Sequence, residues 1–362
     1  MFEDLPNKPY YVFLLAILGG VGLSLGTWWS PLILFVAFLP LLEIDIHLKH
    51  KNASGTYLYF FIYIFIALLI WNAVFATINL SLPWQEVWLQ ILLSTLFQTW
   101  VFILFRITRD AINEAYGYFS WVLYWLSLEY VLLVTGFPEV GLILGNAFAK
   151  STYLVQWYEV TGVLGGSMWI LSINVFLYLA IRSKFSVNRK VFGIYVCMIL
   201  AIAYVVSLYF KNEDLARTPT REISISTSEI RNIKTCASQE LFRGSLLASQ
   251  VKAFICAHKQ NASLSANYFL DQAKLRAIEN RCFALVLIED SQLGLINPAG
   301  EFLKNVPKAS ELQVRAKSRT TFYAKQGDYL GRLAVFLAIG LFLTGLIRHQ
   351  IGPKDKTSVP LK

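Results

Sequence analysis

Apolar residues along the chain gather in long runs that are separated by short polar or basic segments. Most runs hold roughly 17 to 25 residues with few or no charges, the length that a helix needs to cross about 30 Å of hydrocarbon. About eight such runs are present, and the second is short. They lie near Tyr10–Trp29, Pro31–Leu42, Thr56–Ile78, Val87–Phe105, Tyr118–Thr135, Val160–Ile181, Val191–Phe210 and Leu330–Ile347. The pattern predicts a polytopic α-helical membrane bundle.

The composition supports this prediction. Of the 362 residues, 56% are hydrophobic and only 15% are charged, whereas a soluble domain averages about 25% charged residues. The net charge of +9 could indicate a nucleic-acid partner, but most Lys and Arg residues stand beside the apolar runs. That is where the positive-inside rule places the basic residues of a membrane protein. We therefore expect no nucleic-acid partner, and no cofactor.

Basic residues are distributed unevenly between the two sides of the predicted spans. If the N-terminus is cytoplasmic, every basic cluster beside a span lies inside, and the outside loops 79–86 and 136–158 contain only Lys150. The long segment 211–329 then lies outside. We expect a protein of the bacterial inner (cytoplasmic) membrane, with both termini cytoplasmic and a periplasmic soluble domain.

The segment 211–329 shows the alternating order of strands and helices that is typical of an α/β domain. Its apolar and β-branched patterns predict strands in 221–233, 251–257 and 282–289, helices in 239–249 and 266–281, and a turn at Asn297–Gly300. We expect the chain to divide into a bundle of seven spans (1–210), this small α/β domain (211–329), a last transmembrane helix (330–348) and a cytoplasmic tail (349–362).

Two groups of short motifs stand out against this background. The first is Trp125-Leu-Ser-Leu-Glu-Tyr130, Thr135-Gly-Phe-Pro138, Leu144-Gly-Asn-Ala147, Gln156, Glu159, Thr161-Gly-Val-Leu-Gly-Gly166, Trp169 and Asn174. The second is Lys274-Leu-Arg-Ala-Ile-Glu-Asn-Arg281, Ile296-Asn-Pro-Ala-Gly300, Thr321-Phe-Tyr323 and Gly327-Asp-Tyr-Leu-Gly-Arg-Leu-Ala334. In order and spacing these motifs resemble the apolipoprotein N-acyltransferases, inner-membrane enzymes that add the third acyl chain to the N-terminal cysteine of lipoproteins.

The resemblance implies a layout that agrees with the predicted topology: eight spans, with a nitrilase-like domain between the seventh and the eighth. It also implies phospholipid and lipoprotein as partners. In the family, a cysteine thiolate takes an acyl chain from a phospholipid as a thioester and passes it to the lipoprotein amine, with a glutamate as base and a lysine stabilising the oxyanion.

Cys236 is the positional match to the family's cysteine, since it stands at the family's distance ahead of Arg276. The family has Cys-Tyr-Glu at this place, whereas here Ala237 and Ser238 follow the cysteine. The segment between Phe210 and Cys236 is much shorter than in the family, so the base and the lysine have no counterpart that we can assign. A thiol near its free pKa of about 8.5 is mostly protonated at neutral pH. We expect Cys236 to be inactive.

Several other residues are candidates for lipid or lipoprotein binding. Glu129 and Glu159 are ionisable groups close to the membrane, and Gly136, Phe137, Pro138 and Gly162 could shape a lipid-facing cleft. Each has a structural alternative, because carboxylates can hydrogen-bond inside a bundle and glycines permit close helix packing. No Cys or His residues stand at metal-ligand spacing, so we expect no metal site.

These observations favour a degenerate member of the family with a truncated nitrilase-like domain. We expect an N-acyltransferase-like membrane protein, catalytically inactive, that binds lipid, lipoprotein or partner proteins as a subunit of an envelope or lipoprotein-handling complex. The alternative is an active apolipoprotein N-acyltransferase that passes a phospholipid acyl chain through a Cys236 thioester to the lipoprotein N-terminus. The sequence favours a protein without enzymatic activity but leaves both open.

Overall fold

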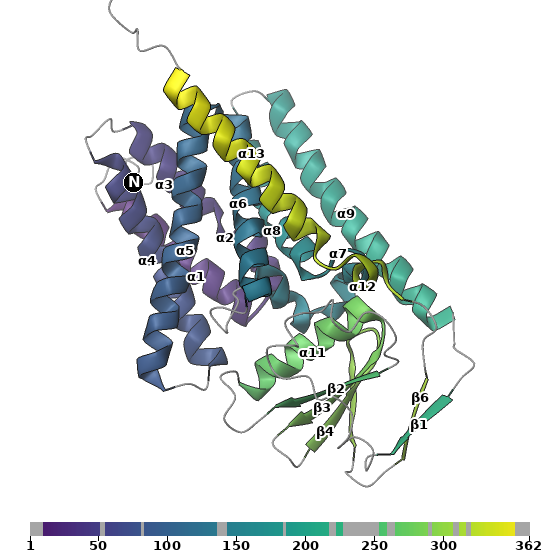
Figure 1. Cartoon of the computed structure of the whole chain (residues 1–362). Coiled ribbons are helices and arrows are strands. Elements are labelled where there is room, and N and C mark those ends of the chain that lie inside the picture. Colours follow the sequence, from purple (N-terminus) through teal and green to yellow (C-terminus); the bar gives the residue numbers. More distant parts are fainter. Residues whose placement is uncertain are drawn as a thin grey trace, which may run out of the picture.

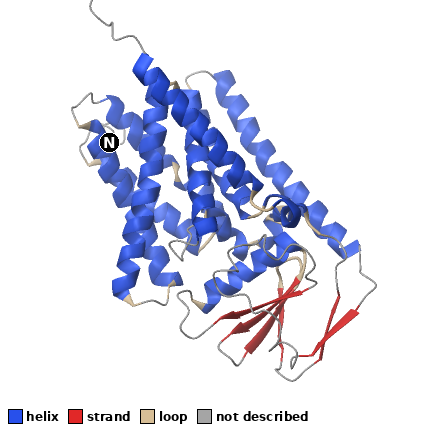
Figure 2. Ribbon diagram, viewed as in Figure 1, coloured by secondary structure: helices blue, strands red, loops and turns tan. Residues whose placement is uncertain are grey.

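Long helices form a bundle in the computed structural model of the chain, and a small region of strands lies at one end of it (Figure 1, Figure 2). The structure describes residues 10–50, 55–80, 83–135, 143–183, 186–216, 222–226, 253–258, 265–288, 292–306, 311–315 and 320–351.

Within the described residues, eight segments are long and apolar enough to cross a membrane, in agreement with the predicted number. Seven are single helices: α1 (Tyr11–Trp28), α4 (Thr56–Asn79), α5 (Trp84–Ala111), α6 (Glu114–Thr135), α8 (Val163–Arg182), α9 (Ser186–Ala216) and α13 (Tyr329–Ile351). The second span is broken into η2 (Pro31–Ile33), α2 (Leu34–Ala37) and α3 (Leu39–His50). Helix α9 continues past Phe210, where the predicted span ends.

The break in the second span has a local cause. Pro40 has no N–H to donate, and it disfavours helical backbone at the residue before it. In an unbroken helix the Phe38 N–H would bond to the Leu34 carbonyl. Here the Asn174 side chain of α8 lies between these two groups: its Oδ1 accepts from the Phe38 N–H at 3.1 Å, and its Nδ2 donates to the Leu34 carbonyl at 2.7 Å. One buried amide thus restores both backbone hydrogen bonds.

We expect Asn174→Leu to lower the free energy of unfolding by about 1–3 kcal/mol, because it leaves buried backbone groups without their polar partner. Thermal unfolding in detergent, followed by tryptophan fluorescence, measures the change. Met168→Leu is the matched control, since Met168 lies on the same helix and is exposed. Equal midpoints for the two variants would show that the amide contributes little.

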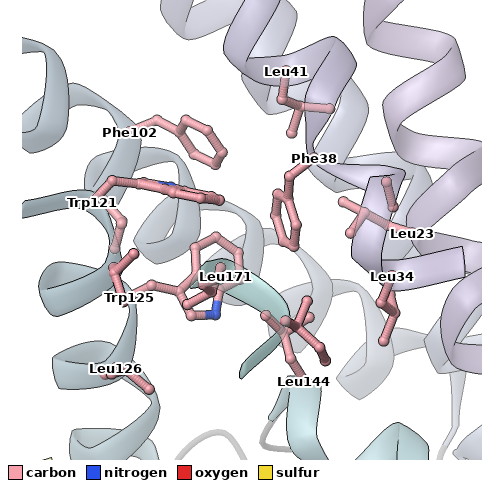
Figure 3. Close-up of a cluster of buried hydrophobic side chains, with 14 of the residues drawn as sticks. Leu23, Leu34, Phe38, Leu41, Phe102, Trp121, Trp125, Leu126, Leu144 and Leu171 are labelled. Carbon is pink, nitrogen blue, oxygen red and sulfur yellow. The ribbon is translucent and has the colours of Figure 1, made fainter. Parts of the chain in front are cut away.

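Aromatic side chains form the centre of the bundle (Figure 3). Phe38 meets Trp121 and Trp125 edge-on, with 5.2 Å between ring centroids in each pair. Phe102 lies 5.6 Å from Trp121. Edge-to-face pairs such as the two that Phe38 makes each contribute about 0.5–1.5 kcal/mol beyond the area they bury. Leu144 joins the same buried cluster from a short 3₁₀ helix, η3 (Leu144–Lys150), so this segment belongs to the core of the bundle.

A buried ion cluster lies where α3 and α5 meet. The Asp45 carboxylate pairs with Arg109 and lies 3.5 Å from Arg106 Nε. All three side chains are at most 3% exposed. The Arg106 guanidinium also donates to the Thr56 carbonyl at 3.1 Å and lies 4.4 Å from the ring centre of Tyr57. These two arginines, which the sequence marks as basic residues beside a span, are therefore part of the interior.

Within the described part of the chain, the strands form one sheet of four and one pair. The sheet has the order β2 (Ala253–His258), β3 (Phe283–Ile288), β4 (Gln292–Ile296) and β5 (Phe302–Val306). Strands β2 and β3 are parallel, joined through helix α11 (Ala266–Asn280), and the other neighbours are antiparallel. Strand β1 (Glu222–Ser226) pairs antiparallel with β6 (Glu311–Arg315). We call the four-stranded sheet together with α11 the α/β region.

Helix α11 packs between the sheet and the bundle. Its residues Phe269, Ala273 and Ala277 are buried against the sheet. Its other side contributes Tyr268, Leu275 and Ile278 to the core of the bundle. Three short helices complete this end of the molecule: η4 (Thr152–Leu154), α7 (Tyr158–Thr161) and α12 (Phe322–Gln326). Helix α11 thus contributes to two separate cores, that of the bundle on one side and that of the sheet on the other.

Most of the elements predicted between 211 and 329 are present. The strands predicted in 221–233, 251–257 and 282–289 correspond to β1, β2 and β3, and the helix predicted in 266–281 is α11. The turn at Asn297–Gly300 is closed by a bond from the Gly300 N–H to the Asn297 carbonyl at 2.9 Å. The helix predicted in 239–249 lies outside the described residues. Strands β4, β5 and β6 were not predicted.

Candidate functional site

The predicted site residues fall into two groups. Glu129, Glu159 and Gly162 are described by the structure. Gly136, Phe137, Pro138 and the candidate nucleophile Cys236 lie outside the described residues, so their predicted roles stay predictions.

Glu129 is buried inside the bundle, with 1% of its surface exposed. Its Oε1 accepts from the Trp125 indole at 2.9 Å and from the Leu144 backbone N–H at 3.0 Å. A carboxylate in this place satisfies a backbone donor at the first residue of η3. Glu129 therefore fastens η3 to α6, and its predicted role in lipid or lipoprotein binding stays a prediction.

Glu159 lies on α7, at the contact between the bundle and the α/β region, and is paired with Arg281. The Arg281 guanidinium also donates to Gln156, at 2.7 Å to the side-chain Oε1 and at 2.6 Å to the backbone carbonyl. Both side chains of the ion pair are at most 7% exposed. Arg281 follows α11 with a left-handed backbone (φ 49°), which ends the helix and turns the side chain toward α7. One buried guanidinium thus joins two segments that are far apart in the sequence.

A second buried pair lies one turn earlier on α11. Glu279 pairs with Arg276, and its Oε1 accepts from the Val163 backbone N–H at 2.8 Å. Val163 is the first residue of α8, where a negative charge is favourable because the helix dipole is positive at that end. Burial raises the pKa of the Glu279 carboxyl to about 7, while Arg276 and the Val163 N–H oppose the rise. We call these contacts of Gln156, Glu159, Val163, Arg276, Glu279 and Arg281 the junction.

Gly162, between α7 and α8, is required by this arrangement. Its φ of +65° is in the region that favours glycine, and a Cβ at this position would collide with the ring of Tyr323. The close approach brings α12 against the turn between α7 and α8. Close packing of this kind is the structural alternative for Gly162, and its predicted role in shaping a lipid-facing cleft stays a prediction.

A cavity of about 40 Å³ lies between the bundle and the N-terminal half of α11. Its bundle wall is largely apolar, and its lining also includes one basic, one acidic and several neutral polar side chains. The lining residues are Thr27, Trp28, Trp71, Phe75, Ile78, Asn79, Ile143, Asn146, Ala147, Lys150, Tyr268 and Asp271.

Asn146 gives this cavity an unsatisfied polar group. Its Nδ2 lies 3.5 Å from the Tyr268 hydroxyl, and within the described part of the chain its Oδ1 has no hydrogen-bond partner although the residue is only 5% exposed. Either orientation of the amide leaves one of its polar atoms unpaired. A buried polar group of this kind indicates a water molecule or a ligand in the cavity.

The sequence did not identify as candidates most of the residues that make the buried ion pairs and hydrogen bonds of the junction. Arg276, Glu279 and Arg281 stand in the motif Lys274–Arg281, which carries part of the family resemblance, but their buried partners are more than 100 positions away in two of the three cases. Asn146 stands in another of the quoted motifs and was likewise not a candidate. One sequence signal could have identified Arg276 and Glu279: they are charged residues among the apolar positions of a predicted amphipathic helix, where a buried charge needs a partner.

The chain resembles two curated proteins. It is 26% identical over 200 residues to the apolipoprotein N-acyltransferase of Chlorobaculum tepidum, a match that covers 54% of this chain and 36% of that protein. It is 30% identical over 188 residues to the apolipoprotein N-acyltransferase of Geobacter metallireducens, covering 50% of this chain and 35% of that protein. The chain is related to the apolipoprotein N-acyltransferase family.

The similarity to this family is partial in extent. The matched segments span only about a third of the length of the two relatives. No model of a protein family matches the chain. The similarity therefore supports an acyltransferase-like membrane protein. That this chain has the activity of an N-acyltransferase is only a hypothesis.

Proposed function

We propose that this chain is an N-acyltransferase-like membrane protein that binds a lipid or a lipoprotein at the cavity and does not transfer an acyl chain. The cavity is the observation that carries the proposal. Trp71, Phe75 and Ile78 offer an apolar wall from α4, while Asn146 and Asp271 offer polar groups beside it. A site with an apolar wall and a few polar groups is suited to an amphiphilic ligand.

The absence of transfer is supported by the chemistry of the residues. Alanine and serine follow Cys236 where the family has tyrosine and glutamate. The carboxylates of the junction, Glu159 and Glu279, are each paired with a buried guanidinium. Both carboxylates thus take part in the contacts that hold the α/β region to the bundle, which supports a structural role for them.

The proposal includes a location and an assembly. The distribution of basic residues supports an inner membrane protein with cytoplasmic termini and the α/β region, as a truncated nitrilase-like domain, in the periplasm. Without transfer, binding of a lipid or lipoprotein would serve a complex of envelope or lipoprotein-handling proteins. The chain would then be its lipid-binding subunit.

Lipid binding is tested with the full chain in nanodiscs that contain a photoactivatable phospholipid, with the labelled residues mapped by mass spectrometry. We expect labelling of the cavity lining in the wild type and about tenfold less in Asn146→Leu, since the loss of one hydrogen-bonding group is comparable to the 1.4 kcal/mol that changes affinity tenfold. Thr344→Val, an exposed change on α13, is the control. Labelling that Asn146→Leu leaves unchanged would exclude the cavity as the site.

Acyl transfer is tested by the intact mass of the protein purified gently from its own membranes, with and without neutral hydroxylamine. We expect an unmodified Cys236 and the same mass profile, apart from the substitution, in Cys236→Ser. An acyl mass that hydroxylamine removes, present only in the wild type, would instead establish the Cys236 thioester and the active N-acyltransferase. Stoichiometric co-purification of other envelope proteins would support the subunit role.

A further inference from the structure

The two ends of α11 are attached to the bundle by contacts of different kinds. At the C-terminal end, Arg281 and Glu279 make the buried, charged contacts of the junction. At the N-terminal end, the contacts described between α11 and the bundle are neutral: the Ser265 N–H donates to the Asn79 carbonyl at 2.8 Å, and Tyr268 packs edge-on against Phe75. Breaking a buried ion pair is more costly than breaking a neutral hydrogen bond.

The chain itself is also tethered at the C-terminal end of α11. The Thr321 hydroxyl donates to the Glu279 carbonyl at 2.6 Å, and Tyr323 packs against Gly162. These residues lead through α12 directly into α13, the last candidate span. Helices α7 and α12 both contact α11, and Figure 1 shows them near its C-terminal end. The ion pairs and the covalent connection thus meet at one point.

The cavity lies under the opposite end of α11. Tyr268 and Asp271 line it, and Tyr268 is thirteen residues before Arg281, which is about 20 Å along a helix. A volume of about 40 Å³ is enough for water, but pockets that enclose a whole ligand measure about 300–1,000 Å³. In the arrangement that the structure describes, this space is therefore smaller than a pocket that encloses a lipid head group.

We propose that α11 is a hinged cover for this cavity, fixed at the junction and able to lift at its N-terminal end. The proposal rests on the proposed function, because it explains how a lipid or lipoprotein enters a cavity that is too small for it. The helix does not bend in this motion. Phe269, Ala273 and Ala277 hold it against the sheet, so the α/β region moves as one body about the junction.

A covalent link at the free end tests the hinge. The double variant Asn79→Cys/Ser265→Cys places two thiols on adjacent residues, one at the end of α4 and one at the start of α11. Oxidation, or a short bismaleimide if the disulfide does not form, closes the cover. We expect the linked protein to take up the photoactivatable phospholipid with about tenfold lower labelling of the cavity, because only the lifted state admits it.

The reduced double variant is the matched control for the disulfide, and the two single variants control for the native thiols. Recovery of labelling on reduction supports the hinge. Equal labelling of the linked and unlinked forms would overturn the hinge while leaving lipid binding at the cavity established. Failure of both forms, and of the wild type, to label the cavity would overturn the proposed function and the hinge together.

Discussion

Replacing Arg281 with methionine is expected to lower the free energy of unfolding by about 3–5 kcal/mol, because it leaves the Glu159 carboxylate buried without its cation. Methionine keeps the length of the side chain, and its cost in the left-handed backbone at this position is similar to that of arginine. The loss should also release α11 from α7. Thermal unfolding in detergent measures the first effect, and faster proteolysis within the α/β region measures the second.

The double variant Arg281→Met/Glu159→Gln distinguishes a lost ion pair from lost packing. With both charges removed, no uncompensated charge stays in the interior, so we expect the double variant to recover most of the stability lost by the single one. A single variant that loses less than about 1 kcal/mol would place this pair with ordinary surface ion pairs. The junction would then not anchor the α/β region.

The second large effect is expected at the other buried ion cluster. Asp45→Asn keeps the shape of the side chain but removes the negative charge between Arg106 and Arg109. Arg109 keeps its pair with Asp110 at 2.9 Å, but that carboxylate is 34% exposed, and Arg106 loses the nearby charge of Asp45. We expect a loss of about 3 kcal/mol in the free energy of unfolding, the lower end of the cost of breaking a buried ion pair. Thermal unfolding in detergent, followed by tryptophan fluorescence, measures it.

Glu43→Gln is the matched control for Asp45→Asn. Glu43 also lies on α3 and pairs with an arginine, Arg182, at 3.3 Å, but these side chains are 24% and 39% exposed. Solvent screens such a pair, so we expect a cost below about 1 kcal/mol. Equal costs for the two variants would show that burial of the Asp45 cluster has no special importance.

The spans were predictable because their signal is local. A run such as Thr56–Ile78 shows its length and its lack of charge within one segment, and α4 begins and ends within one residue of it. The broken second span was less predictable, since the device that repairs the break, Asn174, stands 136 residues after Phe38. Similarly, a hydropathy profile predicts that Arg106 is an exposed charge beside a span. Its burial depends on Asp45, which lies on another helix.

The strands show the same limit. Strands β2 and β3 are apolar runs and were predicted, whereas β5 (Phe302–Val306) and β6 (Glu311–Arg315) contain charged and amide side chains in short segments. Their pairing with β4 and β1 decides that they are strands, and pairing is a tertiary property. A pattern within five residues does not contain that information.

For the site, the sequence identified individual residues but not their relations. Glu159 and Gly162 were candidates for lipid binding, which stays a prediction, and the sequence did not predict that both lie at the contact with the α/β region. The reason is that their partners Arg281 and Tyr323 come from segments near the end of the chain. The roles of Cys236 and of Gly136–Pro138 stay predictions.

The junction also sets an order of events during synthesis. Glu159 and Val163 emerge from the ribosome more than 100 residues before Arg281 and Glu279, which complete them. Until then α7 carries a carboxylate and the start of α8 a backbone donor without these partners, and contacts of such long sequence separation form late and slowly. A nascent bundle that ended at α9 would therefore be an unfinished fold, and we expect quality-control proteases to degrade it faster than the complete chain.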